Sequence, residues 1–291
     1  MRLHLITAIM FLATSAGAQT AQPWMSNDVP AAWNQGFTGA GTRIVMVDDF
    51  TSVGRIRGNI GLGSQVANHG TWVTNFAAAI APGASAAAHD FNSRRSVALQ
   101  ANTLNILNLS YSMYASSGFS ADQIGWSSQE RSIINFANSG QAIVVKAAGN
   151  DATIIGSGNR RGTTDYLNSA LIGQQSTIFV GALNSNGTPT AKTSLAGYSN
   201  RPGTDVTIQN QFVSVGVRRD ITGLAGTSFA APIVSGYAAI IGSKFRTASP
   251  TQIANQLLST ARQDTITNYN PALHGRGEAS LARALSPVTI R

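Results

Sequence analysis

The chain contains no cysteine, so disulfides, thiol nucleophiles and cysteine-ligated zinc are all excluded. Charged residues make up only 11% of it, yet its net charge is +8. The basic residues are scattered, and only Arg94-Arg95, Arg160-Arg161 and Arg218-Arg219 form pairs. A nucleic-acid-binding protein usually concentrates its positive charge on one face, so we expect no nucleic-acid partner. A basic module that binds surfaces or nucleic acid is an alternative that depends on charge alone.

Long apolar runs are also scarce. The apolar residues 5–13 lie near the N-terminus, after a polar start with Arg2 and before the small residues Ala16-Gly17-Ala18. This pattern predicts a signal peptide, residues 1–18, that is cleaved before Gln19 and sends the protein to the periplasm or the medium. The alternative is a hydrophobic N-terminal helix that stays in the fold. No later run reaches the length of a membrane span, so we expect none.

The remainder, residues 19–291, is long enough for one large domain, although two smaller domains are also possible. Apolar, β-branched runs predict buried strands at 42–47, 105–110 and 142–148, and small apolar runs predict buried helices at 69–80 and 228–244. Two further helices are predicted by capping boxes at 127–130 and 249–252. Residues 151–167 and 184–209 are polar and read as surface excursions. This alternation predicts the α/β class, a mainly parallel sheet with helices on both faces.

Four polar side chains stand at the ends or starts of these predicted elements. Asp48 and Asn150 each follow a strand directly, and His69 begins a helix. Ser228 lies where a glycine-tight turn becomes a helix, and backbone N–H groups and the helix dipole there stabilise developing negative charge. Because open parallel sheets form their sites at the carboxyl ends of strands, we expect these four residues to meet. Together they predict a nucleophilic serine with a base and an orienting acid.

The motifs around these residues resemble those of the subtilisin-like serine proteases, the subtilase family or peptidase S8. The resemblance runs from about Val29 to Ala261, and its blocks appear in the family's order. They are the lead-in Pro30–Gly41, Asn68-His-Gly-Thr71, Ala147-Ala-Gly-Asn150 and Gly226-Thr-Ser-Phe-Ala-Ala-Pro232.

This resemblance implies a three-layer α/β/α fold, with residues 19–291 forming one subtilisin-like peptidase domain. It makes Ser228 the nucleophile, His69 the general base and then acid, and Asp48 the residue that orients the imidazole. Asn150 would donate its amide to the oxyanion, together with the backbone N–H of Ser228. The implied chemistry needs no metal and no organic cofactor.

Each of these residues also has a structural interpretation. Ser228 could cap a helix, His69 could bond at a helix start, and Asn150 could occupy a left-handed turn. Asp49 competes with Asp48, since successive strand residues point to opposite faces and only one can reach His69. The register of the block favours Asp48, and the kexin-like branch of the family also pairs two aspartates with the first one catalytic.

The resemblance also implies two walls of a substrate pocket, one formed by Ser110, Tyr111 and Ser112 and the other by Ala147, Ala148 and Gly149. Tyr111 and Ser112 stand where leucine and glycine are commoner, so we expect a narrowed pocket that favours small or slender side chains. The stretch from Asp90 to Asn105 is shorter than in typical relatives. In relatives that stretch holds the edge strand that pairs with extended substrate. If the strand is missing here, long peptides should bind less well, and the protein either uses another edge or takes an unusual substrate.

These features predict a secreted serine endopeptidase that acts on peptides or proteins through an acyl-enzyme. The alternative is a weak or inactive binding scaffold on the same fold, suggested by the short segment and by the lack of room for an inhibitory pro-domain. Without a pro-domain, the chain either folds unaided, is helped by a separate inhibitor or chaperone chain, or keeps its activity low. No carboxylate cluster specifies a calcium site, and we expect Asp151, Asp165, Asp205 and Asp220 to be solvated.

Overall fold

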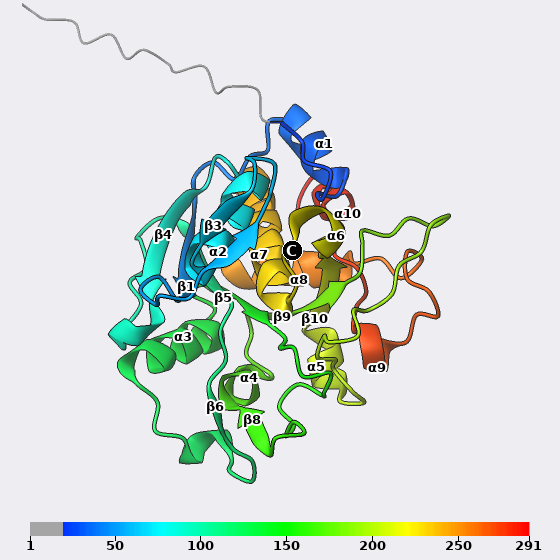
Figure 1. Cartoon of the computed structure of the whole chain (residues 1–291). Helices are drawn as coiled ribbons and strands as arrows, with labels where there is room; N and C mark the ends of the chain where they lie inside the picture. Colours follow the sequence, from blue (N-terminus) through cyan, green and yellow to red (C-terminus); the bar gives the residue numbers. More distant parts are fainter. Residues whose placement is uncertain (1–19, 291) are drawn as a thin grey trace, which may run out of the picture.

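The computed structural model describes residues 20–290, which fold around one six-stranded parallel sheet (Figure 1). The order of the strands is β10-β9-β7-β5-β1-β4, and every neighbouring pair is parallel. Their bounds are β1 Thr42–Asp48, β4 Ser85–Asp90, β5 Leu104–Leu109, β7 Ile143–Ala147, β9 Thr177–Leu183 and β10 Phe212–Gly216. The α/β prediction is confirmed. The signal-peptide prediction falls on residues outside this description.

Alternating residues of the central strands pack into two separate hydrophobic cores, one on each face of the sheet. Ile44 and Met46 of β1 pack into one core, and Val45 and Val47 pack into the other, as the two-residue period of a strand requires. The first core is covered by α1 Asp28–Asn34, α2 His69–Ile80, α7 Thr227–Lys244, α8 Pro250–Ser259 and α10 Leu281–Leu285. The second is covered by α3 Ser128–Ser139, α4 Tyr166–Leu171 and α5 Val206–Asn210. Helices therefore lie on both faces.

The shorter elements lie around these layers. They are the two-stranded pairs β2 Ile56–Gly58 with β3 Gln65–Ala67 and β6 Tyr114–Ser116 with β8 Thr163–Asp165, the helices α6 Arg219–Thr222 and α9 Pro271–His274, and the 3-10 turns Phe91–Ser93 and Ala121–Gln123. Within residues 20–290, no helix is both long enough and apolar enough to span a bilayer.

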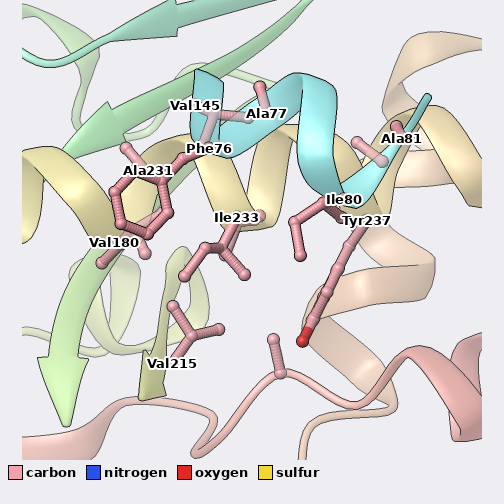
Figure 2. Packing of buried hydrophobic residues seen from close by; sticks show 14 of the residues in the cluster. Phe76, Ala77, Ile80, Ala81, Val145, Val180, Val215, Ala231, Ile233 and Tyr237 are labelled. Carbon is pink, nitrogen blue, oxygen red and sulfur yellow. The ribbon is translucent and has the colours of Figure 1, made fainter. Parts of the chain in front are cut away.

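Helices α2 and α7 pack closely against each other beneath the site. A Cβ placed on Gly236 of α7 would lie 2.4 Å from Cγ2 of Ile80, so only glycine allows this approach. Figure 2 shows the two helices meeting over strand residues such as Val145 and Val180. The pairing fixes the relative position of the two helix N-termini, which carry His69 and Ser228.

Most predicted elements occur within a residue or two of their expected bounds, and the capping box predicted at 249–252 forms. Three regions differ. At the capping box predicted for 127–130, Ser127 caps α3 by accepting from the N–H of Gln129, but the Glu130 carboxylate accepts from the Ser127 hydroxyl and not from its backbone N–H. The polar stretches 151–167 and 184–209 contain β8 with the start of α4, and the start of α5.

Candidate active site

The Asp48 and His69 side chains meet at the carboxyl end of β1. Asp48 is its last residue and is only 1% exposed, while His69 is the first residue of α2. Nδ1 of His69 lies 2.6 Å from Oδ1 of Asp48. An ionised carboxylate only accepts hydrogen bonds, so Nδ1 carries the proton and Nε2 is left to act as a base.

Backbone contacts hold the start of α2 against the exit of β1. Asn68 caps the helix by accepting from the N–H of Thr71 at 2.9 Å, and its amide donates to the carbonyl of Phe50 at 2.7 Å. The N–H of Gly70 donates to the carbonyl of Asp49 at 2.9 Å. The imidazole is thus positioned by main-chain geometry on both sides of it.

The neighbouring Asp49 binds the turn after β1 and forms no hydrogen bond with the histidine in the described part of the chain. Its Oδ1 accepts from the N–H groups of Thr51 and Ser52 at 3.2 and 2.8 Å. Burial acts to raise the pKa of Asp49, but hydrogen bonds from Ser52 and Thr51 outweigh it and lower that pKa. Asp49 therefore stabilises the turn after β1, and the histidine contact belongs to Asp48.

The negative charge of the buried Asp48 carboxylate is only partly stabilised by its surroundings. Burial raises its pKa, against the opposing effect of the hydrogen bond to His69. Among the described residues its Oδ2 has no hydrogen-bond partner. A buried carboxylate in this condition is compensated when the adjacent imidazole gains a proton, because an opposite charge close by favours the ionised form.

Ser228 is the second residue of α7, after the N-cap Gly226 with its positive φ of 129°. Its carbonyl accepts from the Ser110 hydroxyl at 2.9 Å, and its own hydroxyl donates to the Ser110 carbonyl at 3.3 Å. Within the described part of the chain, its hydroxyl forms no hydrogen bond with His69. The residue that follows it, Phe229, does contact the histidine, since the Phe229 ring lies 5.6 Å from the imidazole, centroid to centroid.

Asn150 follows β7 and is held by Thr227, a residue that the sequence motifs had not assigned a role. Oδ1 of Asn150 accepts from the Thr227 N–H at 2.9 Å and from its hydroxyl at 3.1 Å. The same hydroxyl accepts from the N–H of Gly149 at 3.1 Å. With Oδ1 occupied in this way, the NH₂ end of the amide is the end available to a ligand. The motif position next to Ser228 was the only signal in the sequence for Thr227.

The two expected pocket walls leave the sheet side by side, from β5 and β7. The Ala148 carbonyl accepts from the amides of Asn168 and Asn200 at 3.1 and 3.0 Å, which fixes that wall. Ser110 contacts Ser228 through the two hydrogen bonds described above. Tyr111 turns inward, stacks on Phe91 at 5.5 Å and donates to Glu130 at 3.3 Å. Burial, followed by the Glu130 charge, raises the pKa of Tyr111 well above its usual value.

Asp165 lies behind these walls, and the expectation that it is solvated is wrong. It is 7% exposed, and its Oδ2 lies 3.1 Å from Nζ of the fully buried Lys146. Its Oδ1 accepts from the N–H of Met113 at 2.9 Å, while Lys146 donates to the carbonyl of Ala147 at 2.9 Å. The buried ion pair therefore ties the two walls together from below.

The stretch after Asp90 contains one 3-10 turn, Phe91–Ser93, and no strand before Leu104. Among residues 20–290, no three histidine, aspartate or glutamate side chains are grouped so that they could hold a metal ion.

A serine, a histidine and a buried aspartate near the carboxyl end of a parallel sheet are the residue types of a catalytic triad, which recurs on several unrelated folds. The model of the subtilase family (peptidase S8) matches residues 62–277. The chain belongs to the subtilase family, and by family and fold it is a subtilisin-like serine peptidase.

Similarity to individual proteins points the same way. Mycosin-5 of Mycobacterium tuberculosis is 41% identical over 102 residues, which span 29% of this chain and only 16% of that protein. MycP1 from the ESX-1 type VII secretion system is similar in structure, with a TM-score of 0.58 and 18% identity over 94% of this chain and 88% of its own. The MycP3 protease from the type VII (ESX-3) secretion system is also similar in structure, with a TM-score of 0.56 and 19% identity over 91% of this chain and 89% of its own. At such identities these structures support the fold alone.

Proposed function

We propose that this protein is a serine endopeptidase that cleaves peptide bonds through an acyl-enzyme. In this mechanism His69 Nε2 takes the proton of the Ser228 hydroxyl as Oγ attacks the scissile carbonyl, and it later donates that proton to the leaving amine. Asp48 keeps the imidazole in the required tautomer and stabilises the imidazolium. In the second half, His69 takes a proton from water as the water oxygen attacks the acyl ester, and it returns that proton to Ser228 Oγ as the acid product leaves.

Two donors would hold the oxyanion that forms in both halves of this reaction. The first is the NH₂ group of Asn150, whose orientation is supported by the two bonds from Thr227 to its Oδ1. The second is the N–H of Ser228, one of the first N–H groups of α7 and therefore without a carbonyl partner inside the helix. Such donors act mainly on the transition state, in which the charge develops.

The observation that carries the proposal is the 2.6 Å contact between Asp48 and His69, at the end of the sheet where Ser228 and Asn150 also lie. It supports a base that is already in the reactive tautomer. The proposal is tested with casein and with internally quenched peptides, comparing the parent with Ser228→Ala. We expect turnover in the parent and none in the variant, with nearly unchanged thermal stability because only a hydroxyl is removed. Equal turnover in both would show that Ser228 is not the nucleophile.

A second candidate, a weak or inactive scaffold, is favoured by one observation. The Ser228 hydroxyl donates to the Ser110 carbonyl instead of to His69. Catalytic hydrogen bonds are often loose without substrate and tighten in the complex, so the enzyme remains our proposal. A scaffold would bind peptides with the same affinity in the parent and in Ser228→Ala, and would hydrolyse none.

We also propose that the protein acts after export, on peptides or proteins outside the cytoplasm. The support is the signal-peptide pattern of residues 1–18 together with similarity to proteases whose names associate them with type VII secretion systems. Cell fractionation of a tagged chain tests this. We expect the tag in the periplasm or the medium, with processing before Gln19.

A further inference from the structure

The hairpin formed by β2 and β3 leads directly into α2, and only one of its faces is packed (Figure 1). On the packed side, Ile56 and Ala67 lie against the first core, and the Ile56 carbonyl accepts from the Trp72 indole at 2.9 Å. Since successive strand residues point to opposite faces, the cross-strand pair of Arg57 and Val66 points outward. Val66 is 51% exposed, so this outer face is left open by the described part of the chain.

Apolar side chains also project from both ends of this hairpin. Val53, before β2, is 94% exposed, and Leu62, in the turn between the strands, is 69% exposed. The glycines on either side of Leu62 have φ of 105° and 82°, a backbone that other residues rarely adopt. The turn is nevertheless anchored, because Ile60 is buried and its carbonyl accepts from the Trp24 indole at 3.1 Å. An anchored turn therefore presents a leucine to solvent.

The charge of this surface is positive. No acidic residue occurs between positions 50 and 89, where the only arginines are Arg55 and Arg57, both exposed. Arg55 donates to the Ser52 carbonyl at 2.7 Å, and Arg57 donates to the Ser64 hydroxyl at 3.4 Å. These acceptors are neutral, so they satisfy N–H groups but leave the charge of each guanidinium uncompensated.

The carboxylates nearest to this surface are already engaged. Asp49 and Asp90 accept from backbone N–H groups of the turn after β1. On the other side of the hairpin lies α6, where Asp220 accepts from Arg218 at 2.8 Å. The next arginine of α6, Arg219, is exposed and forms no ion pair with any described residue. The surface around the hairpin therefore carries a net positive charge.

We propose that the outer surface of this hairpin docks the protein on an anionic lipid bilayer. This surface, the hairpin face, consists of Val53, Arg55, Arg57, Leu62 and Val66. Its charge is complementary to acidic lipid headgroups, and each arginine close to such a membrane strengthens attachment. Val53 and Leu62 project from the protein, and a bilayer accepts projecting apolar side chains without a complementary pocket. The hairpin face contains none of the candidate catalytic residues, so this inference does not depend on the proposed peptidase function.

Docking in this way would bring the candidate active site close to the membrane. The strand β3 ends at Ala67, and Asn68 alone separates it from His69. A peptidase held in this orientation would meet substrates that are themselves attached to the lipid surface.

The first test measures vesicle binding by the chain without residues 1–18, whose apolar run would itself bind lipid. One set of vesicles contains phosphatidylcholine alone, and the other contains phosphatidylcholine mixed with phosphatidylglycerol. We expect co-sedimentation with the mixed vesicles only, and less of it at high salt because salt screens the attraction between charges. Binding to neither set, or equal binding to both, would overturn the proposal.

Variants then locate the binding surface. Val53→Ser and Leu62→Ser should each weaken binding to the mixed vesicles about tenfold, as the loss of one buried apolar side chain gives, and Arg57→Gln about fivefold. Val288→Ser and Arg246→Gln are matched controls, since Val288 is 91% exposed and both residues lie together beyond the C-terminal end of α7. The controls should bind like the parent. Controls that lose as much binding as the hairpin variants would overturn the assignment of the surface.

Insertion into lipid is tested with a fluorescent label. The chain has no cysteine, so Leu62→Cys offers a single attachment site for the environment-sensitive dye NBD. We expect its emission to rise and to shift to shorter wavelength with the mixed vesicles, because the bilayer excludes water from the dye. The same dye on Val288→Cys should show no change. Bound protein in which only the label at position 288 responds would show that another surface docks, and would overturn the proposal.

An acidic protein segment is the other occupant that this charge could attract. It is tested by the fluorescence anisotropy of a labelled oligoglutamate peptide. If the parent binds this peptide, loses the binding in Arg57→Gln, and binds no vesicles, the hairpin face serves a protein partner and the lipid proposal is wrong. All of these readouts measure binding, so they stand whether or not the chain cleaves peptides.

Discussion

The replacement of Asp48 by asparagine separates the catalytic role of this carboxyl from its effect on stability. The variant keeps an oxygen that can accept from His69, but its NH₂ group also allows the imidazole to present the wrong tautomer. For a buried aspartate in this position we expect turnover to fall about ten-thousandfold. That fall corresponds to about 5 kcal/mol of transition-state stabilisation.

The same variant should lose turnover without losing stability. Because the pKa of Asp48 is raised in the folded protein, ionising it there is unfavourable. Its contribution to stability is fully present below the unfolded pKa of about 4 and is lost as the pH rises through the folded value. Asparagine does not ionise, so the variant avoids this loss. At pH 7 its free energy of unfolding should equal that of the parent or exceed it by up to about 2 kcal/mol. The difference should shrink near pH 3.

The assay combines steady-state hydrolysis of a quenched peptide with urea denaturation at pH 3 and pH 7. Asp49→Asn is the matched control, since that side chain only stabilises the turn after β1 and should alter turnover no more than about threefold. A larger loss of turnover for Asp49→Asn than for Asp48→Asn would refute the assignment. A variant at position 48 that is clearly less stable than the parent at pH 7 would refute the electrostatic reasoning.

Three further perturbations test other parts of the structure. Asn150→Ala should lower kcat about a hundred- to thousandfold, the magnitude known for subtilisin, with KM nearly unchanged; steady-state kinetics that show mainly a higher KM would contradict the oxyanion role. Lys146→Met leaves the buried Asp165 carboxylate unpaired and should lower the free energy of unfolding by about 3–5 kcal/mol, whereas adding Asp165→Asn should restore part of it; a neutral single variant in urea denaturation would contradict this. Burial lowers the pKa of His274, against the opposing hydrogen bond that the imidazole donates to the carbonyl of Asn270, so the parent should lose stability as the pH falls below about 6.5. Denaturation at pH 5 and pH 7.5 should show a smaller loss in His274→Gln, and an equal loss would exclude this residue as the cause.

Local sequence signals predicted the central part of the fold because local chemistry determines it. Within the strand predicted at 42–47, residues 44–47 form an unbroken apolar run, which is typical of a buried parallel strand. Asn68 and Ser249 cap helices as their residue types favour. The two-residue period of the strand allowed only one of Asp48 and Asp49 to reach His69, and the register of the motif favoured Asp48. In the structure Asp48 contacts His69, and Asp49 accepts from the turn after the strand.

Features that depend on distant parts of the chain were missed or mistaken. The edge strand Ser85–Asp90 is rich in alanine and partly exposed, so it lacks a β-branched pattern. Asp165 is buried only because Lys146, on another strand, neutralises it, and no local pattern records such a pairing. Tyr111 was expected to line the groove, but the contacts with Phe91 and Glu130 that turn it inward come from segments about 20 residues away on either side.

The most direct test of the central claim is the reaction of the chain without residues 1–18 with a fluorophosphonate probe, read by intact mass and peptide mapping. Such a probe labels a serine only when a base and an oxyanion site are assembled around it. We predict one equivalent of label on Ser228, and none in folded Ser228→Ala. Well-folded parent protein that takes up no label, or takes it up equally in the variant, would contradict the assembled triad of Asp48, His69 and Ser228.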